Sequence, residues 1–245
     1  MLTFFLAFIM LVTLNASAIA EEITVAAGAG LKDVLNDIAA AYVHSNPSVR
    51  VTKSWVVSGV LAKQLDSGAR LDIVFTANRE WMDYVKEKKH VDPATITPFA
   101  YNTVVFVGKG PRRVSRLDEL KNLNRIAVGS PKSVPAGEYA MEALKNAGID
   151  KQVEGKLVMA RDVRESLLYA ERGEVDGAFV YKTDALLSRE VAIWFTVPQN
   201  LYSRVVYLSA LTVSGVGNQD AVNFFSFLRS AEAGALLQKY GFEAP

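Results

Sequence analysis

The sequence predicts a two-lobed α/β protein in which each lobe is a mostly parallel sheet flanked by helices. Three observations lead to this fold class. Short apolar runs alternate with amphipathic segments along most of the chain, a pattern typical of strands that alternate with covering helices. The predicted strands number roughly ten, which is near the limit for one twisted open sheet. No Pro-, Gly- or Ser-rich tether divides the chain, so ordered strands are expected to connect the lobes.

Residues 1–20 are predicted to be a secretory signal peptide. They contain no charged side chain, and an apolar run from Leu2 to Leu14 is followed by the small-residue pattern Ala18-Ile19-Ala20. An uncleaved membrane anchor is the alternative, because the usual basic residue of such a signal is missing. The apolar run is short for a bilayer, which needs about 20 apolar residues. We therefore expect cleavage after Ala20 and a soluble, exported mature protein.

The first part of the mature chain contains three strand–helix units. Residues 23–27 are a short apolar strand, and Gly28-Ala29-Gly30 connects it to a segment whose apolar residues recur at spacings of three and four. Such spacings indicate an amphipathic helix. The predicted strands are residues 23–27, 49–57 and 72–76, and the predicted helices are residues 31–42, 60–66 and 79–88.

The remaining chain continues this alternation. The predicted strands are residues 103–107, 125–128, 156–159, 177–180, 192–197 and 205–213, and the predicted helices lie near residues 117–120, 135–146, 163–172, 183–189, 220–229 and 231–239. The apolar stretches around residues 101–107 and 205–213 are the candidates for connecting the lobes. We therefore assign residues 21–101 and 207–245 to the first lobe and residues 102–206 to the second. A ligand is expected between them, beyond the carboxyl ends of the strands.

Composition and charge argue against several classes of function. The chain has 27 Lys and Arg against 26 Asp and Glu, which leaves no basic excess for binding nucleic acid. It has no cysteine, so disulfides, thiol catalysis, Cys-ligated zinc and a lipid-modified N-terminal cysteine are excluded. For His44 and His90, local spacing suggests no carboxylate or hydroxyl partner, and no metal-ligand spacing is evident. We predict no catalytic residue, no cofactor and no direct ligand of a metal cation.

The glycines after the first strand leave one enzymatic alternative open. Gly28 and Gly30 occupy the first two glycine positions of a dinucleotide-binding fingerprint, but Asp33 stands at the third. A nucleotide site is therefore only weakly indicated. The alternative class is an α/β enzyme that acts on a nucleotide or a phosphorylated substrate.

Three strand-to-helix junctions have features of an anion site. The N-terminus of a helix presents unpaired N–H groups and about half a positive charge. The junction at Gly30 has no capping side chain, the one at Ser58 offers a hydroxyl, and Pro135 is placed for a helix start. Each feature alone is also explained by an ordinary turn or cap.

A set of segments along the mature chain carries a family resemblance. The most specific are Val134-Pro135-Ala136-Gly137-Glu138-Tyr139-Ala140 and Asp162-Val163-Arg164, and the others are residues 23–27 with Leu31, 57–64, 81–84, 127–131, 180–181 and 239–242. In order and spacing they resemble the periplasmic molybdate-binding proteins of ABC transporters. The resemblance implies a type II periplasmic binding protein fold, with lobes joined by two strand crossovers that close on a dehydrated tetrahedral oxyanion.

The resemblance also implies a set of oxyanion-binding residues. These are Gly30, Ser58, Ala136, Val163 and Tyr181. Backbone N–H groups are expected to donate at Gly30, Ala136 and Val163, while Ser58 and Tyr181 add hydroxyls. The family normally has a serine at the first position, so Gly30 leaves only a backbone donor there. Asp162 is expected to cap its helix or pair with a neighbouring arginine, with its carboxylate directed away from the anion.

These expectations define a periplasmic solute-binding protein that captures molybdate or tungstate and delivers it to the membrane permease of an ABC importer. The near-neutral net charge of +1 is compatible with this function, because helix dipoles can hold an anion without basic side chains. We expect a monomer. Binding of another tetrahedral oxyanion, sulfate or phosphate, is the alternative.

Overall fold

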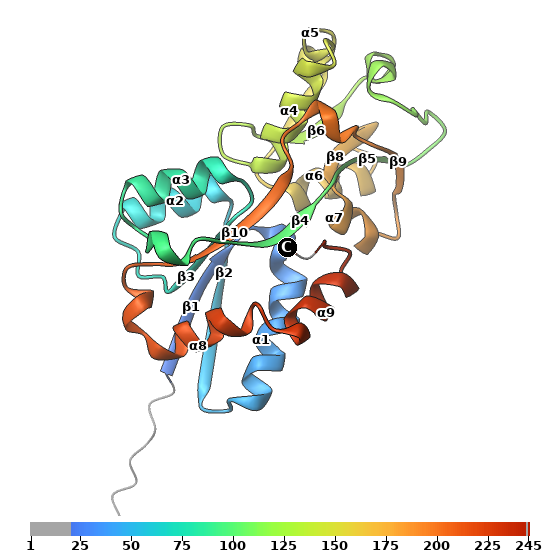
Figure 1. Cartoon of the computed structure of the whole chain (residues 1–245). Helices are drawn as coiled ribbons and strands as arrows, with labels where there is room; N and C mark the ends of the chain where they lie inside the picture. Colours follow the sequence, from blue (N-terminus) through green and yellow to red (C-terminus); the bar gives the residue numbers. More distant parts are fainter. Residues whose placement is uncertain (1–20, 244) are drawn as a thin grey trace, which may run out of the picture.

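The computed structural model describes residues 21–243 and 245 (Figure 1). The predicted signal peptide and its cleavage after Ala20 lie outside the described residues. Among the helices of the described part, none combines the length and apolar character that crossing a membrane requires. The two lobes of the fold each contain one five-stranded sheet, which confirms the predicted class.

The sheet of the first lobe is mostly parallel. Its strands, in spatial order, are β2 (Val49–Trp55), β1 (Glu21–Ala27), β3 (Ile73–Thr76), β10 (Val205–Leu211) and β4 (Thr97–Asn102). β1 pairs in parallel with β2 and β3, whereas β10 is antiparallel to both β3 and β4. β10 therefore runs against the other strands of this sheet.

Helices cover both faces of this sheet. They are α1 (Lys32–Ser45), α2 (Ser58–Asp66), α3 (Arg79–Glu87), α8 (Gln219–Phe227) and α9 (Ala231–Lys239), with short 3₁₀ turns η1 (Ala29–Leu31), η2 (Pro93–Thr95) and η6 (Gly215–Gly217). Neighbouring residues of a strand point to opposite faces. On β3, Phe75 accordingly joins the hydrophobic cluster beneath α1 and α8, whereas Val74 joins the cluster beneath α2 and α3 (Figure 1).

The second lobe repeats the same plan. Its strands, in spatial order, are β7 (Leu157–Ala160), β6 (Ile126–Gly129), β8 (Gly177–Tyr181), β5 (Val104–Gly108) and β9 (Ala192–Thr196). Its helices are α4 (Pro135–Asn146), α5 (Asp150–Val153), α6 (Val163–Glu171) and α7 (Lys182–Leu187), with 3₁₀ turns η3 (Leu117–Asn122), η4 (Glu154–Lys156) and η5 (Gln199–Leu201). Here β5 is the reversed strand, antiparallel to β8 and β9.

Two segments connect the sheets. β4 ends at Asn102 in the first sheet and β5 starts at Val104 in the second, so the chain crosses at Thr103. It returns between Thr196, the end of β9, and Val205, the start of β10. The outward connection is a single residue, whereas the return segment includes η5. The lobe boundaries expected from the sequence, 21–101 with 207–245 and 102–206, stay a prediction.

Two local differences from the expected elements bear on function. α2 begins at Ser58 rather than at residue 60, so Ser58 is the first helical residue instead of part of a turn. The strand β4 was not predicted, because Pro98 interrupts its pattern; proline is tolerated there since β4 is an edge strand. β4 pairs with β10 and so completes the sheet beside the crossover.

Candidate ligand-binding site

A small cavity of about 30 Å³ lies between the two lobes. A single water needs roughly 10–15 Å³, so the cavity has room for one compact ligand and not for a nucleotide. All five residues indicated by the family resemblance line it: Gly30, Ser58, Ala136, Val163 and Tyr181. They come from both lobes, and the fold therefore brings together residues that are far apart in the sequence.

The first helical turn after β1 offers free backbone donors. Gly28 is the N-cap of η1 and makes no side-chain hydrogen bond to the turn. Leu31 N–H donates to the Gly28 carbonyl at 2.9 Å. In the described part of the chain, the N–H groups of Ala29 and Gly30 have no such acceptor, as expected at the start of a helix. Gly30 lines the cavity, which makes its N–H available to a ligand.

Ser58 can contribute two donors. It is the first residue of α2, whose N-cap, Val57, has no side chain able to cap, so its N–H lacks an intrahelical acceptor. Its side-chain oxygen accepts a hydrogen bond from Ala77 N–H at 3.1 Å. A hydroxyl that accepts one bond still has a proton to donate. The bond from Ala77 therefore holds the Ser58 oxygen in place while its proton remains free.

α4 leaves one N–H free at the cavity. Pro135 at its first position has no N–H, and the N–H groups of Gly137 and Glu138 both donate to the Val134 carbonyl, at 2.9 and 3.2 Å. Ala136 N–H is the remaining donor of this turn. A Cβ at Gly137 would lie 1.8 Å from the Gly129 carbonyl oxygen. Glycine at this position is therefore required for α4 to pack closely against the end of β6.

α6 presents its N-terminus in the same way. The Asp162 side chain accepts from Glu165 N–H at 2.8 Å, so it caps the helix as predicted. This cap uses the third N–H of the helix and leaves the N–H of Val163 at the first position. Although Asp162 also lines the cavity, its carboxylate is held by the cap.

Two tyrosine hydroxyls complete the polar lining. Tyr181 ends β8, and Tyr207 lies on β10; their rings pack edge to face with centroids 5.7 Å apart. Within the described residues neither hydroxyl has a hydrogen-bond partner. Burial raises the pKa of each well above its ordinary value, so both stay protonated and can donate. Sequence analysis missed Tyr207, because a tyrosine within an apolar strand has the pattern of a core residue.

The cavity contains no basic side chain in its lining. Arg164, in the first turn of α6, is half-buried, and its Nε lies 2.5 Å from Asp184 Oδ1 while its Nη2 lies 2.7 Å from Asp33 Oδ2. Two carboxylates thus balance its charge. The positive potential of the cavity comes instead from the N-termini of the surrounding helices. Across residues 21–243, no three His, Asp or Glu side chains are grouped as a metal-cation site.

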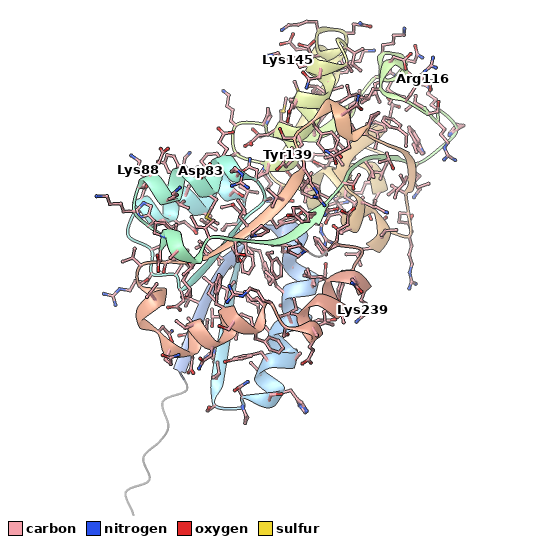
Figure 2. The ribbon with its side chains drawn as sticks, viewed as in Figure 1. Asp83, Lys88, Arg116, Tyr139, Lys145 and Lys239 are labelled. Atoms are coloured by element: carbon pink, nitrogen blue, oxygen red, sulfur yellow. The ribbon has the colours of Figure 1, made fainter. Side chains whose placement is uncertain are left out.

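Contacts between the lobes enclose the cavity. Glu138 of α4 accepts hydrogen bonds from the Asn78 side chain and from Trp81 Nε1, the latter at 2.9 Å. Tyr139, which lies where the lobes meet (Figure 2), donates to the Ala77 carbonyl at 3.2 Å. On another side, Arg164 of α6 pairs with Asp33 of α1. The structure therefore corresponds to a closed form.

Two lobes joined by two crossing segments and closed over a small cavity that backbone N–H groups and hydroxyls line define a solute-binding protein. The chain belongs to the family of bacterial extracellular solute-binding proteins, which residues 23–243 match. It is 35% identical over 238 residues to the molybdate-binding protein ModA of Escherichia coli K12, a match that covers 93% of this chain and 91% of that protein. This similarity confirms the family resemblance seen in the sequence.

Solved structures share the fold at lower identity. The periplasmic molybdate-binding protein of Azotobacter vinelandii superposes with a TM-score of 0.82 at 19% identity, covering 91% of this chain and 99% of that one. The sulfate-binding protein SubI of Mycobacterium tuberculosis superposes with a TM-score of 0.78 at 17% identity, covering 91% of this chain and 86% of that one. Both comparisons concern the fold, which is common to proteins named for different anions.

Proposed function

We propose that this chain binds molybdate or tungstate in the cavity between its lobes and delivers the anion to the membrane permease of an ABC importer. The observation that carries the proposal is the convergence of free donors from several helix N-termini and from buried hydroxyls on one enclosed cavity without a basic side chain. Similarity to the E. coli molybdate-binding protein supports the choice of anion.

Gly30, Ser58, Ala136, Val163 and Tyr181 are the proposed ligands. Each offers an N–H or O–H group and, apart from the hydroxyl oxygens, no acceptor. A fully deprotonated tetrahedral dianion presents acceptors alone, so it matches such a set. A protonated oxyanion, such as hydrogen phosphate, would bring an O–H to a set made up mainly of donors, which is a poorer match. The donor set therefore favours molybdate, tungstate or sulfate over phosphate.

Helix dipoles are the proposed source of charge compensation. Each helix N-terminus carries about half a positive charge, and α2, α4 and α6 all begin at the cavity. Together with the first turn after β1, they offset much of the charge of a dianion. This arrangement explains how apolar side chains such as Ala136 and Val163 can serve an anion site, because their backbone makes the contact.

We further propose that the chain acts by binding alone. It carries out no catalysis and needs neither a cofactor nor a bound metal cation. The cavity is lined by no histidine, and its volume of about 30 Å³ argues against the nucleotide-dependent enzyme. The protein is proposed to work in the periplasm as a monomer whose signal peptide has been removed after Ala20. The family description as extracellular supports export, and N-terminal sequencing of the exported protein would test the cleavage position.

Titration calorimetry with molybdate, tungstate, sulfate and phosphate tests the ligand. Tight binding of molybdate and tungstate, with much weaker binding of the other two, is the expected result. Sulfate is the second candidate, because a sulfate-binding protein shares the fold and sulfate presents the same acceptors. Tight binding of sulfate or phosphate without binding of molybdate would overturn the proposal.

A further inference from the structure

Tyr207 reaches the cavity through the regular alternation of its strand. It shares one face of β10 with Val205 and Leu211, whereas Val206, Leu208 and Ala210 lie on the other face. The register shift between β10 and β4 places its extra residue, Phe99, in β4 and leaves this alternation intact. The Tyr207 ring packs against Phe242 at a centroid distance of 5.7 Å and, as noted, against Tyr181. These contacts hold the ring so that its hydroxyl end joins the lining of the cavity.

The Tyr207 hydroxyl has a proton to donate and no acceptor. The residue is 2% exposed, and no described residue accepts a hydrogen bond from its hydroxyl. Although burial has the larger effect and raises the pKa of Tyr207, the nearby Asn102 side chain lowers it, since Asn102 faces the hydroxyl oxygen as a donor, and so it offers the proton no acceptor. A buried donor without an acceptor is costly and uncommon in folded proteins. The hydroxyl of the neighbouring Tyr181, a proposed ligand, is also buried without a hydrogen-bond partner among the described residues. An anion in the cavity would provide the acceptor that both hydroxyls lack.

The position of the hydroxyl is linked to the glycine at residue 30. A Cβ built on Gly30 would lie 3.3 Å from Tyr207 Oη and 3.7 Å from Val163 Cγ1. The Tyr207 hydroxyl thus occupies the space next to the residue where a side chain would otherwise project. Gly30 has no side-chain donor, and Tyr207 has a donor at that same place.

We propose that Tyr207 is an additional anion-binding residue, whose hydroxyl supplies the donor that Gly30 lacks. This inference rests on the proposed function, since it assigns a residue to the same oxyanion site. It adds a contact from β10, the strand that returns from the second lobe to the first. The hydroxyls of Tyr181 and Tyr207 then bind the anion from opposite lobes.

The first test is calorimetry with molybdate on the wild-type protein and on Tyr207→Phe. Loss of a hydrogen bond to a charged ligand should weaken binding about tenfold or more. The matched control is Tyr42→Phe, a buried tyrosine of the same lobe that packs against Phe224 and Phe227 away from the cavity; its affinity should equal the wild type. Thermal unfolding of each variant verifies that it is folded.

The outcomes separate the two proposals. If the wild-type protein binds none of the four oxyanions, the proposed function fails. If the wild type binds molybdate and Tyr207→Phe binds it equally well, the function stands and the inference about Tyr207 is overturned.

A serine introduced at residue 30 tests whether the Tyr207 hydroxyl takes the place of the side-chain donor that Gly30 lacks. In the wild-type background, the new side chain would crowd the Tyr207 hydroxyl, given the 3.3 Å approach of its Cβ. In the Tyr207→Phe background that hydroxyl is gone, and the serine can donate in its place. Gly30→Ser combined with Tyr207→Phe should therefore recover most of the lost affinity. A double variant that binds no better than Tyr207→Phe would contradict the replacement.

Asp184 provides the alternative explanation, because its Oδ2 would lie 3.5 Å from the same Cβ. Tyr207 could act on the anion indirectly by positioning this carboxylate. Comparing Tyr207→Phe with and without Asp184→Asn decides the matter. A direct contact predicts a similar loss of affinity in both backgrounds. An effect that disappears with Asp184→Asn would make Tyr207 a positioning residue and overturn direct binding.

Discussion

The two lobes contribute to the cavity in different ways. The second lobe presents two backbone N–H groups, from the first turns of α4 and α6, where the side chains of Ala136 and Val163 are apolar, and one hydroxyl, that of Tyr181. The first lobe presents two hydroxyls, those of Ser58 and Tyr207, beside the backbone of Gly30. Backbone donors depend on where a helix is packed, whereas hydroxyl donors depend on the identity of one residue. Tyr181 apart, changes to packing should therefore act most strongly in the second lobe, and changes of side chain in the first.

The largest effect is expected from Gly137→Ala, which tests the packing of α4. The new Cβ would lie 1.8 Å from the Gly129 carbonyl oxygen, so the helix must move away from β6. We expect about 3 kcal/mol less stability in urea unfolding, together with a large loss of molybdate affinity. Gly155→Ala is the control in the same lobe, because nothing lies within 4 Å of its Cβ position. Normal stability of Gly137→Ala would show that this close packing is not required.

Ser58→Ala tests the dependence of the first lobe on hydroxyls. The change removes a donor to the anion and also the acceptor for Ala77 N–H. Affinity for molybdate should fall by about 2 kcal/mol, measured by calorimetry. Ser226→Ala, on the exposed side of α8, should leave the affinity unchanged. Equal affinities of Ser58→Ala and wild type would remove the Ser58 hydroxyl from the site.

A pH effect on stability is expected from Asp184 in the second lobe. Burial raises its pKa from 3.8 to about 6, against the opposing effect of Arg164. The folded protein therefore holds this proton more tightly than the unfolded chain. The stabilisation is complete below the unfolded pKa of 3.8 and is lost as the pH rises through about 6.

The expected size of this effect is about 1–3 kcal/mol. Urea unfolding of wild type and Asp184→Asn at pH 4.5 and pH 7 measures it. As the pH rises from 4.5 to 7, the free energy of unfolding should fall more for the wild type than for Asp184→Asn. A difference between the proteins that is constant with pH would contradict the assignment to Asp184.

The smallest effect is expected from Val163→Ala. Val163 is proposed to bind through its N–H, which the substitution keeps, and its side chain is small and apolar. Molybdate affinity should fall by less than about threefold, which corresponds to roughly 0.6 kcal/mol. A loss as large as that of Ser58→Ala would contradict binding through the backbone at Val163, because it would mean that the side chain of Val163 is needed as well.

Several features of the protein could be predicted from the sequence because they depend on local patterns. Apolar periodicity predicts most strands and helices, and the start of α4 at Pro135 follows from the preference of proline for a first helical position. The cap at Asp162 follows from its place before an amphipathic run. β4 was not predicted, because Pro98 is untypical of a strand in the sequence pattern. The strand forms at the edge of the sheet by pairing with β10, which is distant in the sequence.

By itself, the sequence determined the α/β class, the two lobes and the five residues Gly30, Ser58, Ala136, Val163 and Tyr181 that line one cavity. Local propensities and a motif resemblance carry that information. Only the tertiary structure decided that Tyr207 joins them, with its hydroxyl beside Gly30. The physical reason is that alternation tells which residues share a face of β10, but not what that face meets. The packing of β10 beside the first turn after β1 brings the Tyr207 hydroxyl next to Gly30, and these residues are far apart in the sequence, so no local pattern records their contact.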